Sequence, residues 1–233
     1  MKRKSIFTSI LIALGSLLAL LPLPAQAQKG GTKRKVVAKT TPDSIPLFRG
    51  FAVGTDLIGM GQRLIADYGQ YEACLILNLK DCYFPTIEVG YGQADKLSDA
   101  TNIRYKTAAP YARVGCDYNV LRNKHDSYRL LVGARVAYTS FKYDISSPGV
   151  TDPVWGGHTE YAANDESCSM LWAEIVGRLD AAIAGPLRMG WSVRYRTRIT
   201  NKQGEMGAPW YVPGFGKDGS TRLAATFHIL LEF

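Results

Sequence analysis

Three histidines, His125, His158 and His228, are the residues of this sequence best suited to act as a general base near neutral pH. None has a second His or a Cys at the spacing of a metal site, and the sequence holds no GxSxG, P-loop or dinucleotide-binding pattern. His228 shares a strand face with carboxylates, and membership of a hydrogen-bond network explains that position more simply than catalysis. The sequence therefore predicts no catalytic residue, no metal site and no cofactor.

Arginine is the second residue type that the sequence singles out, because arginines recur at alternate positions of a predicted strand. In the stretch PLRMGWSVRYRTRIT, residues 186–200, arginines occupy four even positions while apolar or aromatic residues occupy most odd ones. Alternation with a period of two is the pattern of a β-strand with two unlike faces. The pattern recurs and predicts eight strands near residues 51–59, 71–79, 86–93, 111–120, 128–141, 169–183, 187–200 and 221–233.

Acids and arginines gather on one face of these strands, with glycines among them. Lysines lie mainly outside the strands, which favours an enclosed face, because buried charges must be paired and Arg pairs carboxylates through a planar fork. We expect a closed interior filled by an Arg–carboxylate network with a structural role. Its members are Asp56, Glu72, Glu88, Arg113, Asp117, Arg129, Arg135, Glu174, Arg178, Asp180, Arg188, Arg194, Arg196, Arg198, Arg222, His228 and Glu232.

The connections between the predicted strands alternate in length. The second, fourth and sixth are short, whereas the first, third, fifth and seventh are long, and residues 60–68 are the only weak helix candidate. This alternation is typical of outer-membrane barrels. The sequence therefore predicts an all-β fold, an eight-stranded antiparallel transmembrane β-barrel of up-and-down topology over residues 47–233. Its outer face would meet lipid and carry aromatic belts at Tyr71, Tyr111, Tyr128, Tyr138, Trp191 and Tyr195.

The N-terminal region explains the net charge of +8. Residues 1–27 have the basic start, apolar run and small-residue cleavage site of a signal peptide, and residues 28–46 are expected to be a flexible basic leader. From residue 40 onward acids and bases balance, which argues against a nucleic-acid partner. The cysteines, Cys74, Cys82, Cys116 and Cys168, match no zinc pattern; we favour free thiols, with two disulfides as the alternative.

Two Gly- and Pro-rich segments, residues 148–157 and 207–219, carry exposed-type aromatic residues. Aromatic side chains in loops are typical of binding surfaces, and equally of a packed cap over a barrel mouth. Both interpretations stay open for Trp155, Trp210, Tyr211 and Phe215.

The chain ends on Phe233, preceded at alternate positions by Leu231, Ile229 and Phe227. This ending resembles the terminal signal that barrel-insertion machinery reads in outer-membrane proteins. The stretches YGQYEA, NLKDCYFP, SFKYDISSPGVTDPVWG, GWSVRYR and WYVPGFGK resemble a family of Gram-negative outer-membrane barrels with no assigned activity. The resemblance implies export to the outer membrane and contact with its lipid, and it leaves any extracellular partner unidentified.

Eight strands enclose too little space for a wide channel. We therefore expect a structural or surface-interaction protein that is neither an open pore nor an enzyme. Two alternatives remain at this point: a barrel enzyme acting on lipid or peptide at the rim, and a soluble periplasmic ligand-binding barrel.

Overall fold

The computed structural model describes residues 46–99, 101–151, 156, 158–204 and 207–233. The predicted signal peptide and all but the last residue of the predicted leader lie outside the described residues. Within the described residues, no helix has the length and apolar character needed to cross a membrane.

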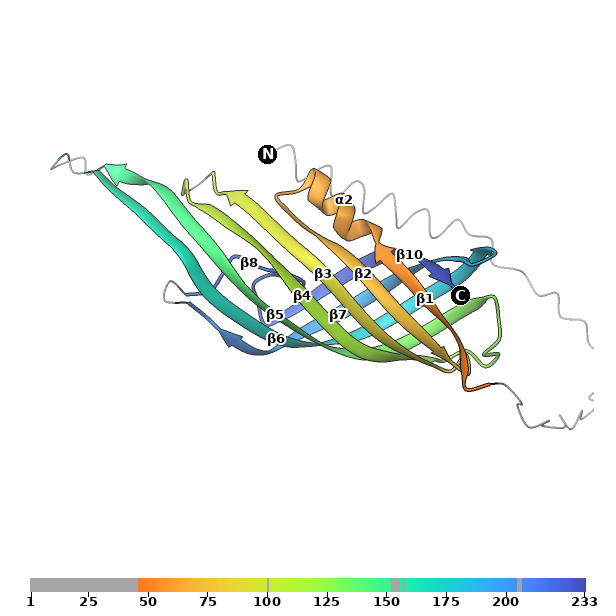
Figure 1. Cartoon of the computed structure of the whole chain (residues 1–233). Coiled ribbons are helices and arrows are strands. Elements are labelled where there is room, and N and C mark those ends of the chain that lie inside the picture. Colours follow the sequence, from red (N-terminus) through yellow and green to blue (C-terminus); the bar gives the residue numbers. More distant parts are fainter. Residues whose placement is uncertain (1–45, 100, 152–155, 157, 205–206) are drawn as a thin grey trace, which may run out of the picture. The chain divides into compact units, whose positions relative to one another are not determined.

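Eight antiparallel strands form a closed barrel in which each strand pairs with its neighbours in the sequence and the last returns to the first (Figure 1). This confirms the predicted strand number and up-and-down order. The strands are β1 (Phe48–Asp56), β2 (Tyr68–Leu79), β3 (Tyr83–Leu97), β4 (Arg104–Asn119), β5 (Tyr128–Thr151), β6 (His158–Ala184), β7 (Leu187–Lys202) and β10 (Thr221–Glu232).

A helix and a small hairpin complete the fold. Helix α2 (Leu57–Ile65) begins where the predicted first strand was expected to continue to residue 59. The strand ends early because the Asp56 carboxylate accepts hydrogen bonds from the N–H groups of Ile58 and Gly59 and caps the helix. Between β7 and β10 the chain forms a two-stranded sheet of β8 (Tyr211–Val212) and β9 (Gly216–Lys217).

The two ends of the barrel are unlike. At one end β2 and β3 are joined by a tight turn in which Lys80 and Asp81 both take left-handed backbone angles, with φ of 56° and 54°. The Asp81 N–H donates to Asn78 Oδ1 and the Asn78 amide donates to Asp81, which fixes the turn. Helix α2 and the β8–β9 hairpin belong to connections at the other end, the long-connection end (Figure 1).

Two of the expected long loops are mostly strand, which corrects the prediction. Strands β5 and β6 continue to Thr151 and from His158, and they pair through most of the segment expected to be loop, residues 142–168. Strands β3 and β4 likewise extend to Leu97 and from Arg104. These extensions alternate in the opposite sense, with polar residues outside, so they do not continue the pattern of the barrel wall.

The barrel interior has three levels. A small apolar cluster near the short-turn end contains Ala52, Ile76, Phe84, Leu131 and Leu230. Buried charged residues fill the middle of the barrel. An aromatic cluster fills the long-connection end: Ala94, Tyr105, Ala109, Tyr111, Ala137, Phe141, Tyr143, Cys168, Met170, Trp172, Tyr211, Val212 and Phe215.

Candidate functional site

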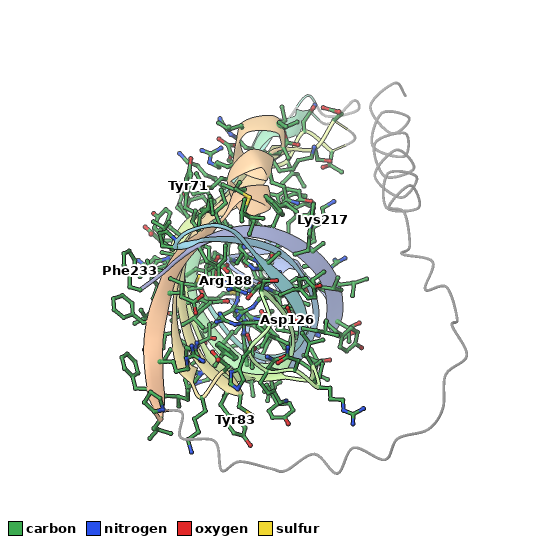
Figure 2. The ribbon with its side chains drawn as sticks, turned by 90° about the vertical axis from the view of Figure 1, so that its right-hand side faces the viewer. Tyr71, Tyr83, Asp126, Arg188, Lys217 and Phe233 are labelled. Atoms are coloured by element: carbon green, nitrogen blue, oxygen red, sulfur yellow. The ribbon has the colours of Figure 1, made fainter. Side chains whose placement is uncertain are left out.

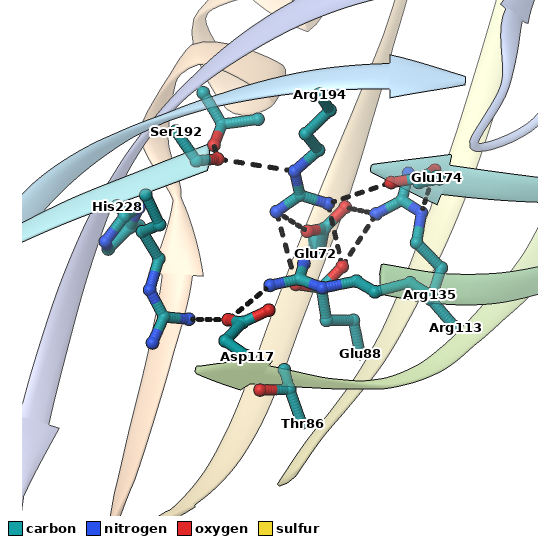
Figure 3. A network of polar contacts seen from close by, with 12 residues as sticks. Glu72, Thr86, Glu88, Arg113, Asp117, Arg135, Glu174, Ser192, Arg194 and His228 are labelled. Atoms are coloured by element: carbon teal, nitrogen blue, oxygen red, sulfur yellow. Dashed lines mark hydrogen bonds and ion pairs between the residues drawn. The ribbon is translucent and has the colours of Figure 1, made fainter. Parts of the chain in front are cut away.

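The centre of the lumen is a layer of ion pairs in which Glu88 is a hub (Figure 3). Arg194 Nη1 lies 2.8 Å from Glu88 Oε2 and Arg113 Nη1 lies 3.1 Å from the same oxygen, while Arg135 pairs with Oε1. The carboxylate is on β3 and its arginines are on β7, β4 and β5. One acidic side chain thus links strands on different sides of the barrel.

Two further carboxylates, Glu72 and Glu174, complete this layer. Glu72 pairs with Arg113 and with Arg194 at 3.3 Å, and it accepts a 2.7 Å hydrogen bond from the Tyr111 hydroxyl. Glu174 lies 3.0 Å from Arg113 Nε and accepts a 2.7 Å hydrogen bond from the Trp172 indole N–H. Arg113 therefore contacts three carboxylates while its residue is only 1% exposed.

A chain of contacts continues from this layer toward the short-turn end. Asp117 lies 3.0 Å from Arg135 and 3.1 Å from Arg178. Arg178 also pairs with Asp180 at 3.0 Å, and Asp180 lies 2.6 Å from His228 Nε2. Each of these buried carboxylates is held by at least two partners.

A second polar cluster closes the short-turn end. Glu232 pairs with Arg129 at 2.7 Å and with Arg188 at 3.3 Å. Asp81 pairs with Arg49 and lies 2.6 Å from His125 Nδ1 and 3.6 Å from Arg129. Burial acts to raise the pKa of Asp81, but hydrogen bonds from Asn78 and His125 and the charges of the two arginines outweigh it, so this pKa lies below its usual value.

Thirteen of the seventeen predicted network residues are buried, and their side chains fill the lumen (Figure 2 shows Arg188 inside the ring of strands). Arg129 and Glu232 are half-buried members of the short-turn cluster, and Arg198 pairs with Asp218 at 3.3 Å. The buried residues are Asp56, Glu72, Glu88, Arg113, Asp117, Arg135, Glu174, Arg178, Asp180, Arg188, Arg194, Arg196 and His228.

Two residues do not fit the network as predicted. Arg222 donates to the carbonyl oxygens of Lys217 and Asp218 and, among the described residues, pairs with no carboxylate. Asp56 is buried but accepts three backbone N–H groups instead of pairing with an arginine at salt-bridge distance. Both residues lie on the side of the barrel where β1 ends and helix α2 begins. The alternation of residues along a strand predicts which face a side chain is on, but it did not predict the partners of these two residues.

Glycines on the inner face make room for large neighbours. A Cβ at Gly115 would lie 2.5 Å from Arg135 Cγ, and one at Gly90 would lie 2.3 Å from the Tyr111 ring. A larger residue at either position would displace a member of the ionic layer. These two glycines are therefore explained by the side chains that they face, and close packing against them fills the narrow lumen.

The β8–β9 hairpin folds into the mouth of the barrel and rests on the ionic layer. Arg113 Nη2 donates to the Gly214 carbonyl at 2.8 Å, and Arg196 Nη1 donates to the Phe215 carbonyl at 2.8 Å. The Tyr105 hydroxyl donates to the Tyr211 carbonyl, also at 2.8 Å. The interpretation as a packed cap is correct for this segment.

The prediction of surface contacts is therefore wrong for Tyr211 and Phe215, which are buried, and Trp210 is partly buried against them. The apolar side chains of the hairpin are removed from water by the barrel mouth, which is why they do not face outward. Trp155 lies outside the described residues.

Tyr111 was expected in an outer aromatic belt, and this prediction is wrong. It faces inward and is buried. Tyr111 is an even number of positions from Arg113 and Asp117 on β4, so the alternation of faces along the strand is enough to place it inside. The same signal identifies Trp172, which shares even parity with Glu174 on β6. Asp81 has no comparable signal because it lies in a turn.

Little space is left in the lumen. Two cavities among the network residues have volumes of about 10 Å³ each. One is lined by side chains that include Glu72, Glu88 and Arg194, and the other by side chains that include Phe84, Arg129 and Glu232. A volume of this size holds about one water molecule.

The outer face of the barrel carries apolar residues between two rows of tyrosine. On β3, Tyr83 and Tyr91 face outward with Ile87 and Val89 between them, and on β5, Tyr128 and Tyr138 bracket the exposed Val132. Figure 2 shows Tyr71 and Tyr83 pointing away from the barrel. The row nearer the short-turn end, called the lower row, is Tyr83, Tyr118 and Tyr128. The row nearer the long-connection end, called the upper row, is Tyr71, Tyr91 and Tyr138.

The polarity of the outer face inverts beyond the upper row. On β5 the next outward residues are Ser140 and Lys142, while the inward residues at this level are Phe141 and Tyr143. Farther along, the outward residues of β4 are Lys106 and Arg104, opposite Asp144 and Ser146 on β5. The apolar outer surface is thus confined to a band.

All four cysteines are free thiols in the structure, as the sequence analysis favoured. Within the described residues, no group of three or more His, Cys, Asp or Glu side chains is arranged to hold a metal ion.

A family model described as "Domain of unknown function (DUF6048)" matches residues 5–232. The chain belongs to this family. No curated protein matches it. Among solved structures, the chain is similar to a major outer membrane protein from Thermus thermophilus, with 10% sequence identity, a TM-score of 0.47, and coverage of 79% of this chain and 100% of that one.

Proposed function

We propose that the chain is an outer-membrane β-barrel of a Gram-negative bacterium, with a filled lumen and a structural or surface-interaction role. The observation that carries this proposal is the band of apolar outward residues, bounded by tyrosine rows, around an interior of paired charges. A barrel in water would bury its apolar face and expose its charges. The reverse arrangement is the one that a lipid environment favours.

The height of the band supports membrane insertion. Tyr128 and Tyr138 are ten positions apart on β5, which corresponds to about 33 Å along a strand. With the strand tilt of about 40° that is usual in such barrels, this spans roughly 25 Å, the height of the apolar band of outer-membrane barrels.

The packing of the lumen supports a role other than conduction. Ion pairs cross the barrel at two levels, the hairpin occupies the mouth at the long-connection end, and the two interior cavities are about 10 Å³ each. To pass through the lumen, a hydrated ion would have to separate buried ion pairs. The separated charges would then lie in a site without water to solvate them, which is energetically costly. We therefore propose a closed barrel that offers its long-connection end to the outside.

Fractionation of cells tests the location. We expect the protein in the outer-membrane fraction, extractable only with detergent, and migrating faster on gels before boiling than after it. Recovery in the soluble periplasmic fraction would instead support a soluble barrel and overturn the proposal. In planar bilayers we expect no steady conductance, and large stable current steps would contradict the closed lumen.

We also propose that the barrel is not an enzyme. His228 is buried and lies 2.6 Å from Asp180, which fits a structural role. A screen of lipid and peptide hydrolysis with the native protein and His228→Ala or His158→Ala tests this. A rim activity lost in either variant would revive the enzymatic alternative.

The C-terminal strand is proposed to be the segment that barrel-insertion machinery reads. Phe233 is exposed, and its ring stacks on Phe51 with centroids 5.5 Å apart. We expect deletion of Phe233 to reduce the amount of assembled barrel in cells while the chain still folds in detergent. Unchanged assembly in cells would contradict this role.

A further inference from the structure

The wall of the barrel is incomplete on one side near the long-connection end. Pairing between β1 and β10 stops at Asp56 and His228, and pairing between β1 and β2 stops at Thr55 and Ala73. The first part of β10, from Thr221 to Phe227, therefore has no β1 residues beside it. Helix α2 follows β1 directly and lies along this side of the barrel (Figure 1).

The free edge of β10 presents backbone donors. The Phe233 N–H donates to the Phe51 carbonyl at 2.7 Å, so the odd-numbered N–H groups of β10 face the β1 side. The Phe227 N–H keeps this direction and donates to the Asp56 carboxylate at 3.2 Å. By the same alternation, the N–H groups of Ala225 and Leu223 point into the gap, where no strand pairs with them in the described part of the chain.

A cavity of about 450 Å³ lies at this gap. Helix α2 contributes Ile58, the β8–β9 hairpin contributes Tyr211 and Phe215, and the free edge of β10 contributes Leu223 and Ala225. This volume is within the range of small-molecule sites and exceeds that of the lumen cavities by far. Polar side chains, among them Gln62 and Gln70, line it together with these apolar ones.

The charged groups that line the cavity are predominantly cationic. Arg196, Lys217 and Arg222 line it, against the single acid Asp56. Both Asp56 oxygens already accept backbone N–H groups, two from α2 and one from β10. Three positive charges therefore line the cavity against one negative charge, and Glu174 offsets part of the charge of Arg196 alone.

The three cations retain unused capacity for an anion. Arg196 is 5% exposed; its Nε pairs with Glu174 and its Nη1 with the Phe215 carbonyl, which leaves Nη2 without a partner among the described residues. Within the described part of the chain, Arg222 donates hydrogen bonds to carbonyl groups only. The Lys217 ammonium lies over the Trp210 ring, 5.5 Å from its centre, and pairs with no described carboxylate.

The cavity also meets the outer surface of the barrel. Leu223 lines the cavity and is 74% exposed on the same face as the apolar band. An elongated apolar group held by its polar end near Arg196 would therefore leave the cavity along the free edge of β10, over Leu223 and Ala225. The positive charge of the site favours an anionic head group, and its opening along the apolar edge favours an apolar tail on the same molecule.

We propose that this cavity binds an amphiphilic anion, with a carboxylate or phosphate head at Arg196, Lys217 and Arg222 and an acyl chain along the free edge of β10. Only the route of entry rests on the proposed function, because a barrel in a membrane would receive such a molecule laterally from the bilayer. The cavity itself is independent of where the protein resides.

Binding of 11-(dansylamino)undecanoic acid to the full chain in a zwitterionic detergent tests the proposal. We expect a saturable rise in dansyl fluorescence that lauric acid reverses, that dodecanol reverses far less well, and that inorganic phosphate leaves unchanged. Removal of two charge-assisted contacts in Lys217→Gln/Arg222→Gln is expected to weaken binding about tenfold or more. A matched control, Lys80→Gln/Arg122→Gln, removes the same charge from exposed turn residues at the short-turn end and should bind as the native protein does.

A second variant guards against loss of folding. Ala225→Trp fills the cavity from the free edge and keeps every charge, and it should abolish saturable binding while the heat-modifiable gel shift persists. Equal loss in the control variant, no saturable binding by the folded native protein, or competition by phosphate as strong as that by lauric acid would each overturn the proposal. Cell fractionation decides the membrane location separately, so failure of one proposal does not imply failure of the other.

Discussion

Between the tyrosine rows the interior of the barrel holds the ionic layer and, near the short turns, a small apolar cluster, whereas beyond the upper row it is aromatic. Glu88 and its arginines fill the first level, whereas Phe141, Trp172 and Tyr211 fill the second. The outer face changes in the opposite sense, from Val132 to Lys142 along a single strand. A strand thus carries one alternation whose sense reverses partway along it.

This difference shows where each level obtains its apolar burial. In the proposed membrane-embedded barrel, the outward residues of the band leave water by entering lipid, so most of the interior at that level can be filled by charges that pair across the barrel. Beyond the band both faces border water or protein, and only the interior can shelter apolar groups. The hairpin completes that core because the extended strands alone leave its mouth open.

The largest effect is expected from breaking the ionic level at its hub. Glu88→Gln leaves Arg135 and Arg194 without their shared negative charge in a buried site, which should cost roughly 3–5 kcal/mol. Urea unfolding in detergent, followed by the gel shift, measures it. Asp95→Asn on the same strand breaks an exposed pair with Arg104 and should change nothing measurable. A small loss at Glu88 would mean that the network contributes little.

A charge on the outer face tests the position of the band. Val132 lies between Tyr128 and Tyr138, near the middle of the band, and an arginine there in Val132→Arg should cost about 2–4 kcal/mol in a bilayer. Ser146→Arg, farther along β5 and exposed beyond the upper row, should be neutral. Unfolding in phospholipid vesicles measures both variants. Equal effects at the two positions would remove the distinction between the levels.

The aromatic level is probed by a milder change. Tyr105→Phe removes the hydroxyl that donates to the Tyr211 carbonyl at 2.8 Å, and a loss of about 1 kcal/mol is expected. Faster hydrogen exchange at the hairpin amides should accompany it. The comparison variant is Tyr118→Phe, whose hydroxyl is on the exposed outer face, and it should leave the hairpin unchanged.

The smallest effect concerns the short-turn cluster and pH. Because partners lower the pKa of Asp81 below its usual value of 3.8, its stabilising effect is complete above that value and is lost as the pH falls through the lower, folded-state pKa. We expect Asp81→Asn to flatten the acid limb of the stability curve below about pH 4 and to leave its neutral part equally sloped. An unaltered acid limb would contradict this assignment.

Much of the wall was predictable from parity. Alternation in the stretch 187–200 placed Arg188, Arg194 and Arg196 inside, because a strand has only two faces and the charges could not all face lipid. The extensions of β5 and β6 were not predictable in the same way. Their polarity is reversed, and a reversed pattern with Gly and Pro resembles a loop until the level of the band is known.

The large cavity was also beyond the sequence. It depends on β1 ending at Asp56, and this ending follows from a helix cap that competes with strand pairing. It depends further on the hairpin returning through the barrel mouth, a contact between segments far apart in the chain. Neither the early end of β1 nor the return of the hairpin follows from a recognisable sequence motif.

The closing pair of strands has a consequence for assembly. Apart from this pair, neighbouring strands follow one another along the chain, but β1 meets β10 through residues such as Ala52 and Glu232, at opposite ends of the folded region. Contacts between distant residues form late because a long loop must close first. Until β10 pairs with them, β1 and β7 are open edges able to join another chain, so the docking of this last strand decides between one closed barrel and aggregation.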